Sequence, residues 1–201
     1  PYKERSRNSD FQIIQNDALR GGLPQCIIED AKRQYMKITQ SQISRGANRK
    51  GLRAACIYSA CQKYNVPRSD KEIAEIFGIT DITIMTRARK LFQQIWNTHQ
   101  KDTVKDIMMP ASKPCDFIQR FCSKLGISED HLQLAITIAN RAEEYGMVSE
   151  NTPPSIAAGS IYLVVQVKEL PITKKEISLA CKTSEVTICK CYKKLNTYKS
   201  Y

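Results

Sequence analysis

The chain has 201 residues, enough for two small domains, and its 42% hydrophobic and 25% charged residues are ordinary for a globular protein. No apolar run approaches the 18 residues that a membrane-spanning helix needs, and the first 20 residues are polar and charged. We therefore expect neither a transmembrane helix nor a signal peptide. The net charge of +11 is typical of a protein with a polyanionic partner, although a solvated lysine-rich surface has the same charge.

The positive charge is unevenly distributed along the chain. Residues 1–100 carry 17 Lys and Arg against 9 Asp and Glu, whereas residues 101–201 carry 14 against 11. Within the second half, residues 174–199 hold seven lysines against Glu176 and Glu185. The C-terminal segment is therefore the part of the second half best suited to an anionic partner.

Helical periodicity dominates the first hundred residues, and strand-like alternation is scarce. Apolar residues at 11–18 predict a short first helix that Gly21 ends. Pro24 opens a second helix, whose apolar face extends to Ile38. A polar, basic loop at 44–50 follows it.

Three further helices follow this loop. The third is expected at about 50–64, and Val66-Pro67 ends it. Ser69 and Glu72 have the capping-box spacing for a short helix through Phe77. After a turn at Gly78, we expect Thr80 to cap a fifth helix that runs from Asp81 to about Asn97.

The second half of the chain repeats the first. Residues 52–91 recur at 156–195 with a constant offset of 104, no gap and 12 identities, a match that chance would not hold through three segments and two turns. The period is too long for a solenoid unit, so each copy should have its own core. The second copy predicts helices at about 115–125, 129–146, 154–167, 174–181 and 184–197. The expected fold is all-α, with a first five-helix repeat at 1–100, a linker containing Pro110 at 101–112, and a second repeat at 113–201.

The cysteines do not form a metal-binding pattern. None of the eight belongs to a CxxC pair, and the chain has two histidines, His99 and His131. A structural zinc site needs four clustered Cys or His ligands. Most of the cysteines lie among apolar residues, so we interpret them as small core residues in a reducing compartment, and we expect no cofactor in this segment.

The last two helices of each repeat have the spacing of a helix-turn-helix. Residues 71–77 and 80–91 form the pair in the first repeat, and residues 174–180 and 184–195 form it in the second. An ordinary αα-corner with a tight turn has a similar pattern. In the second repeat, Val186 and Thr187 could contact base edges, while one of Val186 and Ile188 should lie in the core. The first turns of the second helix also hold Thr183, Ser184 and Lys190, with Lys193 and Lys194 placed for phosphates.

Several runs of sequence resemble the general transcription factor TFIIB. The run from Gly51 to Cys61 and the run from Val66 to Ile73 are similar to its first cyclin-like repeat. The second repeat is matched by the run Asp116–Leu125, by Pro154–Tyr162, and by Thr173–Ile177 with Glu185–Ile188. The resemblance covers almost the whole chain.

The resemblance implies a core that clamps TATA-binding protein on bent promoter DNA and helps to recruit RNA polymerase. In that family the second helix-turn-helix contacts DNA upstream of the TATA element, and the loop before the third helix of the first repeat contacts it downstream. Carried over residue by residue, the DNA-binding positions are Arg45, Gly46, Asn48, Arg49, Lys50 and Arg53 in the first repeat, and Thr183, Ser184, Val186, Thr187, Lys190 and Lys193 in the second. We assign Arg68 and Lys71 to the partner surface and expect a monomer with no membrane association.

The chain also departs from the family pattern. Cys189 and Ala47 replace arginines that are usual in the family, and Asp81 and Ile82 replace lysines that face TATA-binding protein in some members. The family's N-terminal zinc ribbon and reader segment are absent, so the chain is either a core fragment or a divergent form. The abundance of cysteine, lysine and isoleucine favours a eukaryotic or large-DNA-virus source, and hence a nuclear location or a cytoplasmic viral factory.

An enzyme has little support in this sequence, because it has no glycine-rich phosphate loop, nucleophile elbow or metal ligand set. Paired acids such as Glu143 and Glu144 are most simply solvated. The main alternative is a cyclin-type regulatory subunit that binds a protein kinase with the same fold. A cyclin would need neither a basic terminal helix nor a helix-turn-helix pattern in both repeats.

Overall fold

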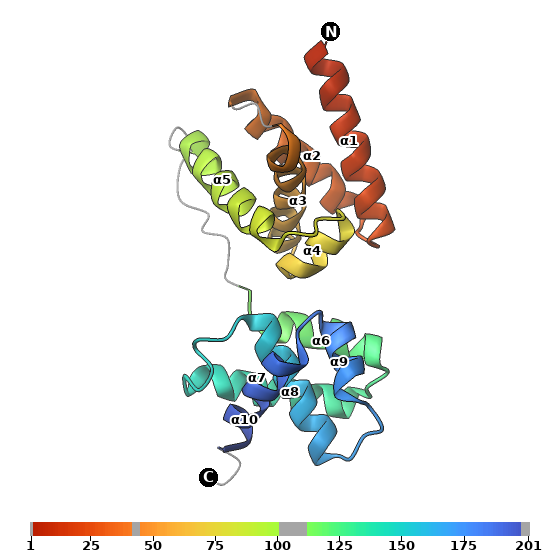
Figure 1. The fold of residues 1–201 in the computed structure, drawn as a ribbon, viewed down its shortest axis with the longest axis vertical. Coiled ribbons are helices and arrows are strands. Elements are labelled where there is room, and N and C mark those ends of the chain that lie inside the picture. The colour runs from red at the N-terminus through yellow and green to blue at the C-terminus, as the bar shows by residue number, and fades with distance from the viewer. Residues whose placement is uncertain (1, 42–44, 101–111, 198–201) are drawn as a thin grey trace. The chain divides into compact units, whose positions relative to one another are not determined.

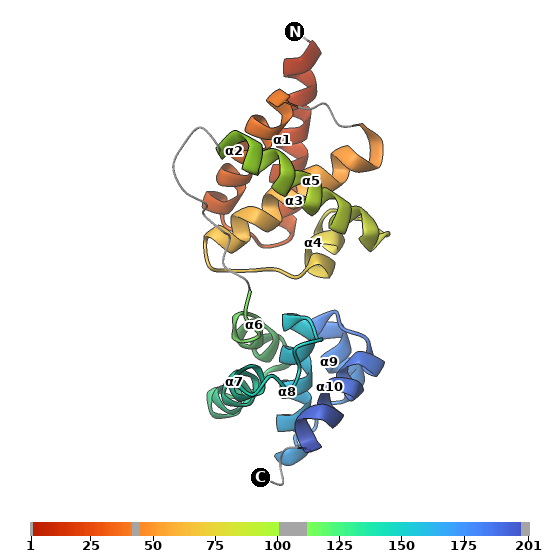
Figure 2. The ribbon, with the colours of Figure 1, turned by 90° about the vertical axis from the view of Figure 1, so that its left-hand side faces the viewer.

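The computed structural model describes residues 2–41, 45–100 and 112–197, which form ten α-helices and no strand (Figures 1 and 2). The chain divides into two compact units, residues 1–110 and residues 111–201. Unit one contains α1 (Tyr2–Arg20), α2 (Gln25–Ser41), α3 (Gly46–Lys63), α4 (Asp70–Ile76) and α5 (Ile82–Gln100). Unit two contains α6 (Cys115–Leu125), α7 (Glu129–Glu144), α8 (Pro153–Val167), α9 (Lys174–Cys181) and α10 (Glu185–Thr197). The expected all-α fold with two sets of five helices is confirmed.

Three helix starts in unit one differ from the sequence-based expectation. α1 begins at Tyr2 rather than near Phe11, so its first two turns are polar. α3 begins at Gly46 rather than near residue 50, and the expected loop at 46–50 is therefore the first turn of this helix. The side chain of Asp81, not Thr80, caps α5, because its Oδ1 accepts the Thr83 N–H at 2.9 Å.

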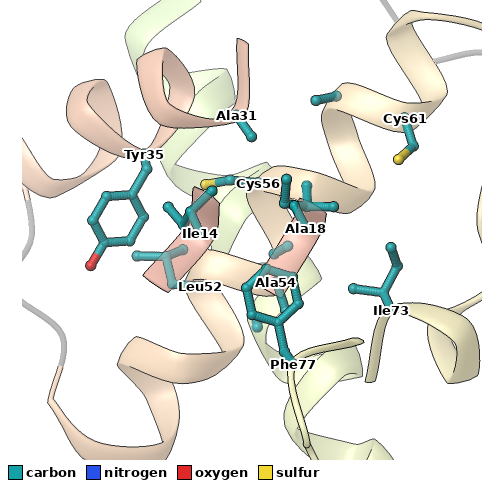
Figure 3. Close-up of a cluster of buried hydrophobic side chains, with 14 of the residues drawn as sticks. Ile14, Ala18, Ala31, Tyr35, Leu52, Ala54, Cys56, Cys61, Ile73 and Phe77 are labelled. Atoms are coloured by element: carbon teal, nitrogen blue, oxygen red, sulfur yellow. The ribbon is translucent and has the colours of Figure 1, made fainter. Parts of the chain in front are cut away.

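In each unit the middle helix packs against the four others. α3 contacts α1, α2, α4 and α5, and α8 contacts α6, α7, α9 and α10. In unit one, the core side chains on α3 meet those of α1 and α2, as Figure 3 shows for Ile14, Tyr35, Leu52 and Cys56. Small buried residues, such as Ala55 on α3 and Gly159 on α8, let the other helices approach closely.

The repeat extends to the backbone and its caps. Capping boxes start α4, between Ser69 and Glu72, and α9, between Thr173 and Glu176. Left-handed residues recur at the same offset of 104: Asn65 with Glu169, and Gly78 with Lys182. Because this conformation reverses the chain after a helix, the two units place their last three helices by the same turns.

Most cysteines are core residues, as the sequence predicted. Five of the eight are buried, namely Cys56, Cys61, Cys122, Cys181 and Cys191. Burial raises the pKa of the Cys191 thiol to about 11 and that of Cys122 to about 12. These thiols therefore stay protonated at neutral pH and pack as small apolar groups. Among the described helices, none has a stretch long and apolar enough to cross a bilayer.

Candidate nucleic-acid interface

The N-terminus of α3 places the first group of candidate residues at the surface of unit one. Arg45 is the N-cap and has an extended backbone, and its side chain makes no capping hydrogen bond. The first turn of α3 carries no acidic residue. Gly46 and Asn48 are exposed, as is Arg45. Uncapped N–H groups and the partial positive charge of a helix N-terminus favour an anion at this position.

Arg49 and Arg53 face inward, toward a buried carboxylate on α1. Asp10 is 3% exposed. Arg49 Nε lies 3.0 Å from both oxygens of this carboxylate, and Arg49 Nη2 lies 2.6 Å from Oδ2. Arg53 Nη1 donates to Oδ1 at 2.9 Å. Hydrogen bonding to Asp10 is the main reason why the pKa of Arg49 is raised.

The same carboxylate accepts a hydrogen bond from α2. The Tyr35 hydroxyl donates to Asp10 Oδ2 at 2.8 Å. Burial, followed by this hydrogen bond, raises the pKa of Tyr35 above its ordinary value. Asp10 therefore joins α1, α2 and α3, and our sequence analysis missed it. Its position four residues before Ile14, on the apolar face of α1, is the pattern that marks it as a buried acid.

Lys50 connects the start of α3 to the helix-turn-helix of unit one. Its Nζ donates to the Gly78 carbonyl at 2.7 Å, in the turn between α4 and α5. Of the six candidates in unit one, Arg49, Lys50 and Arg53 are thus engaged within the protein. Arg45, Gly46 and Asn48 face solvent.

In unit two, α9 and α10 form a helix-turn-helix. Lys182 ends α9 in the left-handed conformation, and the Ser178 hydroxyl donates to the Thr183 carbonyl at 2.7 Å across the turn. The Ser184 hydroxyl then accepts the Thr187 N–H at 3.2 Å, which fixes the start of α10. Ile188 is fully buried against the unit-two core. These contacts determine which face of α10 points outward.

The exposed face of α10 carries most of the candidates in unit two. Val186 is 64% exposed, so of the two apolar residues Ile188 lies in the core and Val186 faces solvent. Lys190 and Lys193 are exposed, and Thr187 is half-buried. The hydroxyl of Thr187 lies 2.7 Å from that of Ser184, which is exposed.

Two residues that the sequence placed at this interface instead form hydrogen bonds within the protein. Thr183 is 6% exposed, and its hydroxyl donates to the Cys181 carbonyl at 3.2 Å, so its side chain leaves the candidate set. Lys194, expected to point to a phosphate, donates to Glu150 at 3.0 Å in the segment before α8. The partners of these two side chains, Cys181 and Glu150, both lie outside α10, so the periodicity of that helix could not reveal these contacts.

Cys189 stands on α10 beside the first residue of α9. It is half-buried, and its interaction with Lys174 is the largest cause of the raised pKa of that lysine. Lys174 Nζ also lies 3.5 Å from a carboxylate oxygen of Glu185. A thiol at this position offers little to a base edge, whereas an arginine donates two parallel hydrogen bonds.

The remaining candidates lie at the start of α4. Lys71 is exposed, and Arg68 Nη1 donates to the Val66 carbonyl at 3.1 Å. Neither residue belongs to the two groups of DNA-binding candidates described above, and their assignment to a protein partner stays a prediction.

Two tandem five-helix units, each ending in a matching helix pair, define a helical protein of the cyclin-like class. The family model for the transcription factor TFIIB repeat matches residues 3–94 and again residues 107–198. The chain belongs to the TFIIB family, whose members are transcription factors and not enzymes.

Three relatives show how far the similarity extends. A transcription initiation factor IIB-like protein of Acanthamoeba polyphaga mimivirus is 37% identical, over 98% of this chain and 45% of its own length. Transcription initiation factor IIB of Methanopyrus kandleri is 32% identical, over 96% of this chain and 60% of its own length. The protein of the same name from Oryza sativa is 32% identical, over 99% of this chain and 64% of its own length. The chain thus spans about half to two thirds of these relatives.

Proposed function

We propose that this chain is the core of a transcription initiation factor that binds the complex of TATA-binding protein with promoter DNA and helps to recruit RNA polymerase. The observation that carries the proposal is the outer face of α10. There Val186, 64% exposed, precedes the exposed Lys190 and Lys193 on a helix whose partner in the helix-turn-helix is α9. An apolar side chain beside cations on such a helix suits a major groove, where thymine methyls and phosphates lie close together.

The two units contribute differently to this proposed interface. Arg45 and Asn48, at the uncapped start of α3, suit phosphates, which carry no sequence information. Val186 and Thr187 suit base edges. In unit two the end of α7 and the segment before α8 are acidic, with Glu143, Glu144 and Glu150 all exposed, so a second phosphate contact there is disfavoured.

We propose that the protein partner contacts unit one at the starts of α4 and α5. Arg68 and Lys71 precede and begin α4, and Ile82 on α5 is 40% exposed. Ile82 occupies the position that Val186 has in unit two, and an acid precedes each of them, Asp81 in unit one and Glu185 in unit two.

The proposed location is the nucleus or a cytoplasmic viral factory, which the similarity to the mimivirus protein supports. A cyclin-type subunit that binds a kinase is the alternative. The repeat family matched by the chain is that of a transcription factor, which favours the first proposal.

The test measures binding of a labelled promoter duplex, with and without TATA-binding protein, over a series of salt concentrations. About six phosphate contacts would make log affinity fall by about five per decade of salt. TATA-binding protein should strengthen binding, because few contacts give weak affinity for bare duplex. A salt-independent complex, or capture of a kinase without DNA binding, would contradict the proposal.

A further inference from the structure

The junction of α1 and α3 holds more cations than its single buried carboxylate can neutralise. Arg49 and Arg53 both bond to Asp10, and the side chain of Arg49 remains 33% exposed. Arg49 Nη2 also donates to the Ser6 carbonyl at 2.9 Å, and it bonds to the Ser6 hydroxyl. The first turns of α1 therefore lie directly beside the candidate DNA-facing start of α3.

One buried donor in this cluster has no acceptor among the described residues. Arg53 Nε is buried and makes no hydrogen bond there. The guanidinium of Arg49 binds Asp10 and Ser6 through Nε and Nη2, and it also interacts with Tyr35. An unpaired donor beside a charged group favours an additional anion.

Arg7 adds a third guanidinium to the same junction. It follows Ser6 and precedes Asp10 by three residues, so it lies within one helical turn of both contacts of Arg49. Arg7 is half-buried, whereas its neighbours Arg5 and Asn8 are exposed. The side chain of Arg7 therefore lies toward the helix bundle, on the side of α1 that carries Asp10.

We propose that the first two turns of α1 form part of the DNA-contacting surface, where Arg7 and the outer edge of Arg49 bind phosphates of the duplex backbone and Asp10 positions Arg49. This inference rests on the proposed function and adds to it an element outside the start of α3. Arg49 and Arg53 already carry two positive charges against the one carboxylate of Asp10, and Arg7 on the same side of α1 adds a third. Glu4, the other acid in the first turns of α1, is exposed.

Asp10 has a positioning role in this arrangement. Its carboxylate holds the guanidinium of Arg49 through Nε and Nη2, which leaves the Nη1 edge directed away from the carboxylate. A guanidinium with a fixed orientation loses less side-chain entropy when it binds a phosphate. Removing the negative charge should therefore weaken DNA binding, although the net charge of the protein becomes more positive.

The experiment compares Arg7→Gln with Arg5→Gln, which removes the same charge from the exposed side of the same helix. Binding of a TATA-containing duplex with TATA-binding protein is measured over a salt series. Arg7→Gln should lower the slope of log affinity against log salt by about one, as expected for one lost phosphate contact. Arg5→Gln should leave this slope unchanged.

Equal slopes for Arg7→Gln and Arg5→Gln, with normal binding by the wild type, would overturn the role of α1 but not the proposed function. The absence of salt-dependent binding by the wild type would instead overturn the proposed function itself. Asp10→Asn tests the positioning role. If Asp10 positions Arg49, this variant should bind DNA more weakly; if Asp10 acts only through its negative charge, removing that charge should raise the affinity for DNA. If thermal denaturation shows that Asp10→Asn unfolds unit one, the comparison of Arg7→Gln with Arg5→Gln by itself decides whether α1 contacts DNA.

Discussion

Gly159 on α8 lies directly against Cys191 on α10. A Cβ at position 159 would lie 2.6 Å from Cys191 Sγ and 2.8 Å from Cys191 Cβ, closer than real Cβ atoms approach other groups. In unit one the corresponding residue is Ala55, and the close approach occurs elsewhere, at Gly51, against Ile84 and Ala88 of α5. The two repeats thus bring their last helix onto the central helix at different points.

Gly159→Ala should therefore move α10 and destabilise unit two. Overpacking of a core by one methyl group costs about 1–3 kcal/mol in the free energy of unfolding. Chemical denaturation gives this value, and DNA binding should weaken because α10 carries Val186. Adding Cys191→Ala, which removes the sulfur but not the Cβ, should restore part of the stability. A variant as stable as the wild type would show that α10 adjusts freely.

Each unit should lose stability when its central isoleucine is shortened. Ile57 and Ile161 are both fully buried, on α3 and α8 respectively. Ile57→Ala and Ile161→Ala should each cost roughly 2–5 kcal/mol, because each leaves a cavity in a packed core. Urea titration measures the loss, with Val167→Ala as a control that changes stability by less than about 0.5 kcal/mol at a 42% exposed site. A loss below that control value at either isoleucine would contradict the packing described.

Arg45 and Arg49 should differ in what their removal changes. Arg45→Ala should weaken DNA binding about equally on all sequences and leave the stability of the protein unchanged, because this exposed side chain suits a phosphate. Arg49→Ala should also lower the free energy of unfolding by about 1.5–3 kcal/mol, since it removes charge-assisted hydrogen bonds to the buried Asp10. Binding and denaturation measured on both variants separate the two roles. Equal stability of the two variants would contradict this distinction.

The outer face of α10 should determine the preference for sequence upstream of the TATA element. Val186→Ala or Thr187→Ala should change this preference by roughly 1–3 kcal/mol if the side chain contacts a base. Cys189→Arg should sharpen it, because a guanidinium can donate two hydrogen bonds to a guanine. Selection from a library randomised upstream of TATA measures the ranking. The same ranking for wild type, Thr187→Ala and Cys189→Arg would mean that α10 does not contact bases.

The hydrogen bond from Tyr35 to Asp10 should make unit one sensitive to alkaline pH. The pKa of Tyr35 is raised in the folded protein, whereas in the unfolded chain it is about 10. Below that value the phenol is protonated in both states. Above it the unfolded chain loses the proton first, so stability falls as the pH rises.

Denaturation of wild type and Tyr35→Phe, compared from about pH 8 to about pH 11, measures the contribution of the phenol to this pH dependence. The wild type should lose more stability than the variant above about pH 10, because phenylalanine has no proton to lose. Parallel pH curves for the two proteins would contradict the raised pKa.

The sequence by itself determined the repeat, the all-α fold and nearly every helix of the second unit. The capping boxes at Ser69 and Thr173 were visible because a cap depends on residues three positions apart, and helical periodicity is equally local. The family followed from short local motifs, such as Gly51–Cys61 within α3 and Val66–Ile73 at the turn into α4. The first turn of α3 was mistaken for a loop, because polar residues and a glycine are common both in loops and in the first turn of a helix.

Tertiary structure alone decided which candidate side chains are available to a partner. Periodicity allowed either Val186 or Ile188 to face outward, and packing against the core of unit two buried Ile188. Arg49 was expected at the DNA-binding surface, and only the structure shows that it also bonds to a carboxylate 39 residues earlier in the chain. The physical reason is that such a contact depends on how α1 packs against α3, and sequence spacing encodes geometry only within a helix.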